Sequence, residues 1–238
     1  MAPIRLFCFP YAGAAAWIFR GLAQRLAGRF DVVAVDLPGR GRRHAEPLVD
    51  DWSVLVRLLA SDVKRQIDRP YALLGYSLGA VVALEVMAEL FRQHSPRSPL
   101  ALIACAAPGP AAMNRSDLHL RDDRRMFEGL RHLGGIPDEM MDSPELLALM
   151  APVVRADLRL FESYRRPDRA PFPVPIVACH GIDDASVGDR YQAWQGETSA
   201  SFRTRGFVGG HMFLHGAEAE LAHAVTADLE ACALPETT

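Results

Sequence analysis

The sequence predicts an α/β fold in which a mostly parallel central sheet is covered by helices on both faces. The expected strands are apolar along their whole length instead of alternating apolar and polar residues, as strands buried on both faces are. Segments with helical spacing of apolar residues separate successive strands, which is typical of crossover connections in a parallel sheet. One long stretch, about residues 111–167, contains helical pieces and no expected strand. We call this stretch the insert.

Each expected strand is a short apolar run that ends at turn residues. The runs cover residues 4–10, 31–37, 71–76, 100–107, 174–179 and 202–208. Pro10, Pro38 and Pro108 mark the ends of three of them, because proline cannot continue a central strand. A sheet of six strands is therefore expected.

The expected helices show apolar residues three or four positions apart. Asp51 is a plausible N-cap for one of them, since its side chain can accept from the first free N–H groups. Three of these helices have the apolar faces Ile18, Leu22 and Leu26; Trp52, Leu55, Val56, Leu59, Val63 and Ile67; and Leu221, Val225 and Leu229. The other expected helices cover residues 126–133, 144–150 and 153–164 of the insert and residues 190–195. Five of the eight methionines lie in the insert. A helical insert between two strands is expected to cover the mouth of a site as a lid, and a purely structural insertion is the alternative.

Length and composition indicate one domain, residues 1–238, with the inserted lid. A net charge of -3 gives no reason to expect a nucleic-acid partner, and no apolar stretch is long enough to cross a membrane. Cys8, Cys105, Cys179 and Cys232 share no metal-like spacing and fit a reducing compartment. A weak resemblance of the N-terminus to a signal peptide is interrupted by Pro10. We expect a monomeric, cytoplasmic protein.

Ser77 lies between an apolar strand and a long helix in the pattern Gly-x-Ser-x-Gly, Gly75-Tyr76-Ser77-Leu78-Gly79. Glycines on both sides allow a sharp strand-to-helix turn that exposes the hydroxyl at the positive end of the helix. Five-residue patterns also arise by chance in ordinary turns, but the strand before and the helix after favour a nucleophile elbow. This pattern predicts a serine nucleophile in a hydrolase fold.

A serine nucleophile needs a base, and in the hydrolase fold the expected order is serine, acid, histidine. His211 is the predicted base, because it follows the last strand in Gly209-Gly210-His211. His215 is the rival and His180 stands behind it. A zinc site at His211 and His215 is not expected, since a zinc protease would have glutamate where Met212 stands.

Asp184 is the predicted acid, with Asp183 as the alternative. Both follow His180-Gly181-Ile182 at the carboxyl end of a strand, where open α/β sheets place their sites. Asp36, also at a strand end, is expected to bond the backbone of its own loop. The oxyanion hole is expected to use the backbone N–H of Leu78 and, after the first strand, that of Tyr11.

Further short motifs run across nearly the whole chain, the insert included. They are Phe9-Pro10-Tyr11-Ala12-Gly13, Asp36-Leu37-Pro38-Gly39-Arg40, Gly75-Tyr76-Ser77-Leu78-Gly79, Leu133-Gly134-Gly135-Ile136-Pro137, Arg155-Ala156-Asp157 and Gly209-Gly210-His211-Met212-Phe213-Leu214. Together they resemble the type II thioesterases, discrete α/β-hydrolases encoded beside polyketide synthases and nonribosomal peptide synthetases. The chain departs from that family at Ala14 and Ala15, where glycine or serine is frequent, and at Ala185, where proline is frequent.

The resemblance implies hydrolysis of acyl thioesters on the phosphopantetheine arm of carrier proteins. In that reaction Ser77 attacks the thioester, His211 takes its proton and later activates water, and Asp184 orients His211. It implies acyl or peptidyl carrier domains as partners and no metal or organic cofactor. A methionine-rich lid would accept several acyl shapes.

Other interpretations stay open at this point. Arg40, Arg42 and Arg43 could meet the phosphate of the arm or an acidic carrier helix, or could be a solvated loop. The same serine, histidine and aspartate could serve a carboxylesterase or lipase acting on free oxoesters. A catalytically silent binding protein with this fold is the alternative from another class.

Overall fold

The computed structural model describes residues 3–114 and 116–233 of the chain. Its strands form one six-stranded sheet in the order β2-β1-β3-β4-β5-β6, and every neighbouring pair is parallel. The strands are β1 (Ile4–Phe9), β2 (Phe30–Ala34), β3 (Tyr71–Tyr76), β4 (Leu102–Cys105), β5 (Ile176–Gly181) and β6 (Phe202–Phe207). The predicted parallel sheet is therefore confirmed.

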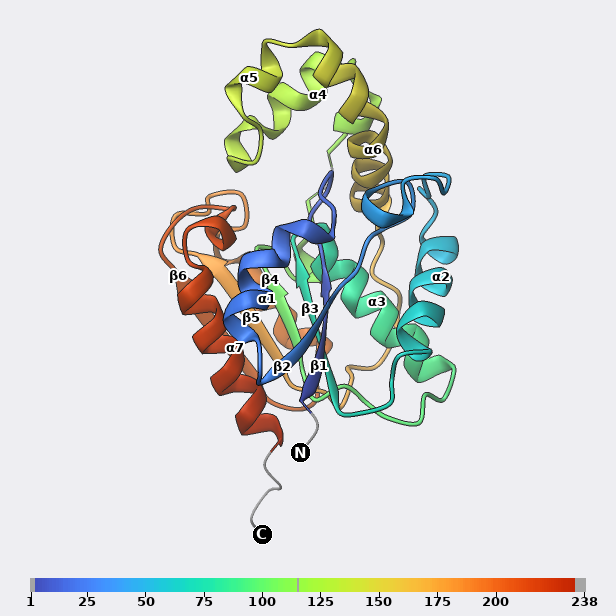
Figure 1. Ribbon diagram of the computed structural model, residues 1–238, viewed down its shortest axis with the longest axis vertical. Helices are drawn as coiled ribbons and strands as arrows, with labels where there is room; N and C mark the ends of the chain where they lie inside the picture. The colour runs from blue at the N-terminus through green and yellow to red at the C-terminus, as the bar shows by residue number, and fades with distance from the viewer. Residues whose placement is uncertain (1–2, 115, 234–238) are drawn as a thin grey trace.

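Helices cover the two faces of this sheet, as the ribbon in Figure 1 shows. One core lies between the sheet and the pair α1 and α7, and the other lies between the sheet and the pair α2 and α3. The α-helices are α1 (Arg20–Leu26), α2 (Trp52–Lys64), α3 (Leu78–Arg92), α4 (Asp123–Leu130), α5 (Asp138–Met141), α6 (Pro144–Ser163) and α7 (Glu218–Ala233). The 3-10 helices are η1 (Ala16–Phe19), η2 (Gly41–Arg43), η3 (Pro110–Ala112), η4 (Leu118–Leu120), η5 (Arg131–Leu133), η6 (Gly188–Glu197) and η7 (Phe213–His215).

The order of the strands creates a switch point between β1 and β3. From β1 the chain moves outward to β2, then returns to β3 on the other side of β1 and continues in the opposite direction. Loops at the carboxyl ends of these strands diverge at such a point and leave a crevice. Ser77 directly follows β3, so it lies at that crevice.

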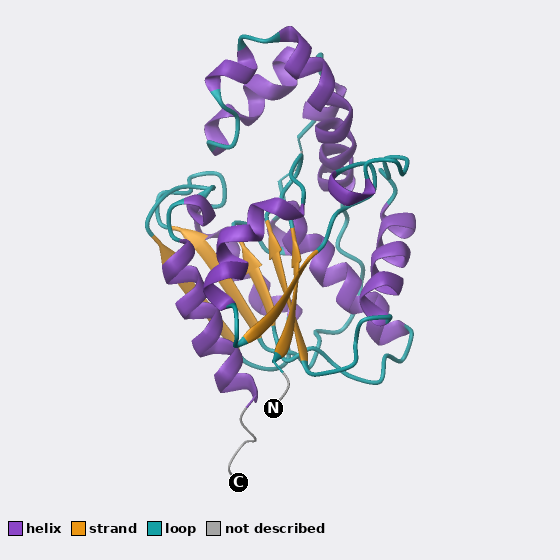
Figure 2. Cartoon of the chain, in the orientation of Figure 1, coloured by secondary structure: helices purple, strands orange, loops and turns teal. Residues whose placement is uncertain are grey.

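The insert stands above the carboxyl ends of the strands (Figure 2). Its helices α4, α5 and α6 form a small core of their own, made by Met126, Phe127, Met141, Leu147, Ala151, Val154 and Leu158. Arg115, inside the range expected for the lid, lies outside the described residues.

The structure corrects one expectation about the insert. Residues 144–150 and 153–164 were expected as two helices, but α6 runs from Pro144 to Ser163 through Pro152. Proline in a helix interior removes one hydrogen bond and costs about 3 kcal/mol. Leu147, Ala151, Val154 and Leu158 form one buried face on both sides of Pro152, so packing offsets that cost.

Smaller differences concern element ends and helix type. The second strand ends at Ala34 instead of residue 37, the fourth begins at Leu102, and residues 188–197 form the 3-10 helix η6. Asp51 caps α2 as expected, because its side chain accepts from the Val54 N–H at 3.0 Å. Among the described residues, no helix combines the length and apolar character needed to span a membrane.

Candidate active site

Ser77 occupies a sharp turn between β3 and α3. Its backbone has φ 54° and ψ -116°, a region that residues with a side chain rarely adopt and that costs about 1–3 kcal/mol. The Ser77 N–H donates to the carbonyl of Cys105 at 2.8 Å, so the serine continues the β3–β4 ladder. The first turn of α3 begins at the next residue, Leu78.

The two glycines of the motif are required by close approach of the backbone. A Cβ atom on Gly75 would lie 2.1 Å from the Gly79 carbonyl oxygen, and one on Gly79 would lie 2.1 Å from the Phe9 carbonyl oxygen. Real Cβ atoms do not come so near, so any larger residue would push α3 away from β1 and β3. The glycines thereby bring the end of β1 beside Ser77.

His211 lies next to the serine. Its Nε2 is 3.1 Å from Ser77 Oγ, although the two residues are 134 positions apart in the chain. Tyr76 supports the loop after β6 that carries His211, which we call the histidine loop. The Tyr76 hydroxyl donates to the His211 carbonyl at 2.5 Å and accepts from the Leu214 N–H at 3.2 Å. Tyr76 and His211 are both buried.

Asp184 lies on the other side of the imidazole, with Oδ2 at 2.9 Å from His211 Nδ1. Burial raises the pKa of the Asp184 carboxyl, but hydrogen bonds from His211, Ser186 and the Val187 N–H outweigh burial, so its pKa lies below the usual value. An ionised carboxylate can only accept, so Nδ1–H of His211 donates to it. In the neutral ring Nε2 is then free to accept the Ser77 O–H.

The aspartate and histidines that the sequence left open as alternatives to Asp184 and His211 have other contacts in the structure. Asp183 is exposed, and its backbone N–H donates to the Gly209 carbonyl at 3.0 Å. His215 contacts the Tyr11 hydroxyl at 3.2 Å. His180 is stacked on Tyr191, with ring centroids 3.8 Å apart.

Two residues that contact His211 or Asp184 were not predicted from the sequence. Tyr76 holds the histidine loop, and the Ser186 hydroxyl lies between Asp184 and His211, 3.1 Å from His211 Nδ1. Ser186 follows the predicted acid by two positions, where a hydroxyl can turn back to the carboxylate. That spacing could have identified Ser186, whereas the Tyr76 contact spans 135 positions and had no local signal.

The backbone N–H groups expected for an oxyanion hole border the same space. Within the described part of the chain, the N–H groups of Tyr11, Ala12 and Leu78 donate to no protein acceptor. Leu78 begins α3, so its N–H is one of the unpaired donors at a helix start. Ala12 and Leu78 line a cavity that also contains Ser77.

Two cavities meet at Ser77 and His211, and Ala12, Leu130 and Leu133 also line both of them. The first has a volume of about 290 Å³ and lies under the insert, with an apolar wall made by Phe127, Leu130, Leu133, Ile136, Met140, Met150 and Val154. The second, of about 240 Å³, adds the polar side chains of Asn114, Ser116, His132, Ser186 and Arg190. The second cavity also has apolar walls, which include Leu118, Leu158 and Phe161, so both cavities offer apolar surface beside Ser77 and the second adds polar groups.

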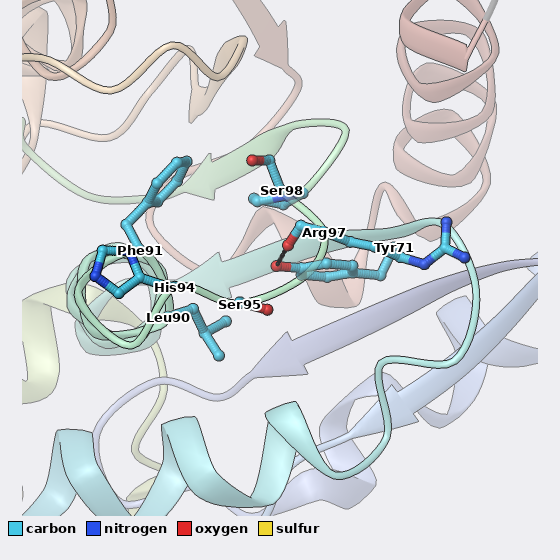
Figure 3. Close-up of a pocket in the computed structure, with 8 residues that line it drawn as sticks. Tyr71, Leu90, Phe91, His94, Ser95, Arg97 and Ser98 are labelled. Atoms are coloured by element: carbon cyan, nitrogen blue, oxygen red, sulfur yellow. Dashed lines mark hydrogen bonds between the residues drawn. The ribbon is translucent and has the colours of Figure 1, made fainter.

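A separate cavity of about 240 Å³ lies at the opposite end of the strands, beside the amino end of β3 (Figure 3). It is bordered by Tyr71 at the start of β3 and by Leu90, Phe91, His94 and Ser95 around the end of α3. The Tyr71 hydroxyl donates to the Arg97 carbonyl at 3.1 Å. Sites in open α/β sheets lie at the carboxyl ends of the strands, so we assign no part of the reaction to this cavity.

The three arginines after β2 have partners within the protein. Arg40 is buried and paired with Asp157, so it does not present its guanidinium to an incoming phosphate. Arg42 pairs with Asp36, and Arg43 pairs with Glu46 and Asp62. None of the three explanations considered from the sequence describes the buried Arg40: contact with the phosphate of the arm, contact with an acidic carrier helix, or a solvated loop.

Asp36 behaves as expected for a loop-bonding carboxylate. It accepts from the Ala16 N–H at 2.7 Å and from the Arg42 N–H at 3.1 Å. Among the described residues, no group of three or more His, Cys, Asp or Glu side chains is arranged to hold a metal ion.

Comparison with known proteins places the chain in a family. The model of the thioesterase domain matches residues 4–229. Linear gramicidin dehydrogenase LgrE of Brevibacillus parabrevis is 32% identical over 234 residues, which cover 96% of this chain and 89% of that protein. The structure of RedJ, a thioesterase from the prodiginine biosynthetic pathway in Streptomyces coelicolor, superposes with a TM-score of 0.89 at 33% identity, covering 95% of this chain and 91% of RedJ.

The type II thioesterase BorB from the borrelidin biosynthetic cluster is also similar. Its structure superposes with a TM-score of 0.86 at 31% identity and covers 96% of this chain and 93% of BorB. The resemblance to type II thioesterases that the motifs predicted is thereby confirmed. The chain belongs to the thioesterase family and is a thioester hydrolase with the α/β-hydrolase fold.

Proposed function

We propose that this protein removes acyl groups from the phosphopantetheine arm of carrier protein domains in polyketide or nonribosomal peptide biosynthesis. The observation that carries the proposal is the chain of contacts from Ser77 to His211 to Asp184, located where two cavities meet. The biosynthetic pathways to which RedJ and BorB belong support this setting.

In the first half of the reaction, Ser77 Oγ attacks the thioester carbonyl while His211 Nε2 takes its proton. The negative charge on Asp184 stabilises the imidazolium that forms. The oxyanion is stabilised by the N–H of Leu78 and by an N–H of the loop after β1, for which Tyr11 is the residue predicted from the sequence and Ala12 is its neighbour. Loss of a single such donor lowers kcat by about 10²–10³ in other hydrolases.

The second half of the reaction releases the acyl group. The pantetheine thiolate leaves and takes the proton from His211, which forms the free thiol and an ester between Ser77 and the acyl group. Water enters, gives its proton to His211 and attacks that ester. The fatty or other carboxylic acid then departs and Ser77 recovers its proton.

The two cavities suit the two ends of such a substrate. We assign the acyl chain to the cavity under the insert, whose wall includes Phe127, Ile136 and Met150. The pantetheine arm carries amide and hydroxyl groups, and these match the polar side chains of Asn114 and Arg190 in the second cavity. In this assignment the insert acts as a lid over the acyl chain.

The location and the partners follow from this substrate. Carrier domains are protein partners, and neither a nucleic acid nor a membrane takes part in the reaction. Four free cysteines fit a reducing, cytoplasmic setting, as the sequence predicts. We propose that the chain acts as a monomer.

Reduction of the thioester is a second candidate, because one relative is named a dehydrogenase. A nicotinamide cofactor commonly binds through a Gly-x-Gly-x-x-Gly turn, and this sequence contains no such motif. Hydrolysis needs only the groups already assembled around Ser77. Addition of NADH or NADPH is therefore expected to change neither the rate nor the product.

Intact-mass analysis of an acylated carrier protein tests the proposal. Wild-type enzyme should remove the acyl mass and leave the free arm, whereas Ser77→Ala should leave the acyl carrier unchanged. A fluorophosphonate adduct on wild type but not on Ser77→Ala would separate an enzyme from a silent binding protein. Faster turnover of a simple aryl ester than of the acyl carrier would instead favour a carboxylesterase or lipase.

A further inference from the structure

Arg40 and Asp157 form a buried ion pair that joins the insert to the loops of the sheet. Asp157 is 0% exposed and Arg40 is 7% exposed. Arg40 Nη2 donates to Asp157 Oδ1 at 2.7 Å, and Nη1 donates to Oδ2 of the same carboxylate. Arg40 follows β2 and Asp157 lies in α6, so the two residues are 117 positions apart.

The same carboxylate holds the loop after β1. The Gly13 N–H donates to Asp157 Oδ2 at 2.7 Å. Val154, one turn earlier in α6, lies against the same residue, since a Cβ atom on Gly13 would be 2.9 Å from Val154 Cγ2. Gly13 has φ +81°, which suits glycine. Residue 13 is therefore fixed against α6 by a hydrogen bond and by a close contact.

Gly13 belongs to the turn that carries the N–H groups proposed for the oxyanion hole. The Ala14 N–H donates to the Tyr11 carbonyl at 3.1 Å, which closes a turn over residues 11–14. Ala12, within this turn, lines both cavities together with Ser77. A shift of about 1 Å in groups that contact a transition state can lower a rate about 100-fold. The position of Gly13 thus controls the position of the donors beside it.

We propose that Asp157 is a positioning residue whose carboxylate, by accepting from the Gly13 N–H, fixes the turn at residues 11–14 so that its free N–H groups face the oxyanion. The inference rests on the proposed function, because it assumes an oxyanion formed at Ser77. Stability alone is a weaker explanation of the pair. Buried ion pairs contribute little net stability, and here the buried Arg40 Nε has no hydrogen-bond partner among the described residues.

Paired substitutions separate positioning from stability. Arg40→Met with Asp157→Leu removes both charges and the acceptor for Gly13, whereas Arg40→Met with Asp157→Asn removes both charges and keeps an acceptor oxygen. The leucine double variant should lower kcat for acyl-carrier hydrolysis about 100-fold. Its KM should stay within about threefold of wild type, because the lost interaction acts in the transition state. The asparagine double variant should keep kcat within about threefold of wild type.

A second readout follows the oxyanion directly. A boronic acid that forms a tetrahedral adduct on Ser77 should bind the leucine double variant about 100-fold more weakly than it binds wild type. A non-hydrolysable thioether analogue of the acyl arm should bind both proteins equally. If the leucine double variant does not fold, Arg40→Met with Asp157→Ala replaces it, with the same expected results.

The Arg205–Asp228 pair provides a control for the loss of an ion pair elsewhere in the fold. Asp228 is also buried and its carboxylate also accepts twice from one guanidinium, at 3.1 and 2.6 Å, while the Arg205 side chain is 40% exposed. The pair joins β6 to α7. Arg205→Met with Asp228→Leu should leave kcat unchanged.

Equal kcat values in the leucine and asparagine double variants at Arg40 and Asp157 would overturn the proposal, whether both are normal or both are low. Failure of the proposed function would appear differently, as acyl-carrier hydrolysis that persists in Ser77→Ala.

Discussion

The Tyr76 hydroxyl donates a 2.5 Å hydrogen bond to the main-chain carbonyl of His211. Tyr76 immediately precedes Ser77, so one short segment carries the proposed nucleophile and also supports the loop of the proposed base. The same hydroxyl accepts from the Leu214 N–H at 3.2 Å, so both ends of the histidine loop depend on it. We infer that the distance between Ser77 and His211 is maintained because Tyr76 is covalently next to Ser77 and hydrogen-bonded to the loop of His211.

Tyr76→Phe should therefore lower activity and stability together. The change leaves the His211 carbonyl and the Leu214 N–H unpaired in a buried place, which costs about 1–3 kcal/mol of unfolding free energy. The freed histidine loop should lower kcat about 10- to 100-fold. Urea denaturation and steady-state kinetics measure the two effects.

Tyr71→Phe is the control for that substitution. The buried Tyr71 hydroxyl also donates to a carbonyl, that of Arg97, but it lies at the amino end of β3, away from Ser77 (Figure 3). The control substitution should reduce stability and leave kcat unchanged. Normal kcat in Tyr76→Phe would show that the hydrogen bond does not hold the histidine.

Asp184→Asn should lower kcat about 10⁴-fold, because an amide cannot stabilise the imidazolium and favours the wrong tautomer of His211. Asp183→Asn, one residue earlier and exposed, should retain wild-type kcat. Steady-state kinetics on both variants compares the acid predicted from the sequence with its alternative. Equal losses in the two would contradict the assignment.

The pH dependence of stability should carry the signature of Asp184. Its pKa is lower in the folded protein than the usual value of 3.8. A carboxyl whose pKa falls on folding stabilises the protein above its unfolded pKa, and this contribution disappears as pH falls through the folded value. The unfolding free energy of wild type should exceed that of Asp184→Asn at pH 7, and the difference should shrink below about pH 4. Urea denaturation at several pH values checks this, and a difference that stays constant down to pH 3 would refute it.

Gly181→Ala should misplace the histidine loop. A Cβ atom there would lie 2.2 Å from the Gly210 carbonyl oxygen and 2.5 Å from that of Gly209. The loop must move away from the Asp184 loop, so kcat should fall about 100-fold. Gly196→Ala is the control, since a Cβ atom on Gly196 meets nothing within 4 Å. Kinetics in which the two variants match would show that the contact is not needed.

Met150→Trp should shorten the acyl chains that the enzyme accepts. Met150 lines the cavity of about 290 Å³ under the insert, and an indole would fill part of it. Discrimination by pocket size is worth about 1–3 kcal/mol, so kcat/KM for a long acyl carrier should fall about 10- to 100-fold relative to an acetyl carrier. Leu149→Trp, at the neighbouring residue that is 69% exposed, should keep the wild-type ratio. An unchanged ratio in Met150→Trp would place the acyl chain elsewhere.

The sequence by itself determined the local features of this protein. The apolar runs and helical spacings predicted a parallel α/β sheet, and the motifs predicted the thioesterase family, both of which are confirmed. These predictions succeeded because strand, turn and helix depend on neighbouring residues. Gly-x-Ser-x-Gly is such a case at Gly75, which the turn itself needs because a Cβ atom there would lie 2.1 Å from the Gly79 carbonyl oxygen. The catalytic roles of Ser77, Asp184 and His211 and the action of the insert as a lid stay predictions.

Only the tertiary structure decided which side chains meet across long stretches of chain. The sequence favoured Asp184 as the acid and left Asp183 open as the alternative, and the packing of their loop against residues 209–210 turned Asp184 toward His211. Arg40 had the pattern of a surface arginine, yet it is buried against Asp157. The hydrogen bond of the Tyr76 hydroxyl to His211 and the continuation of α6 through Pro152 were also decided by the tertiary structure. Each depends on burial and contact between distant segments, and no periodicity or local motif encodes those.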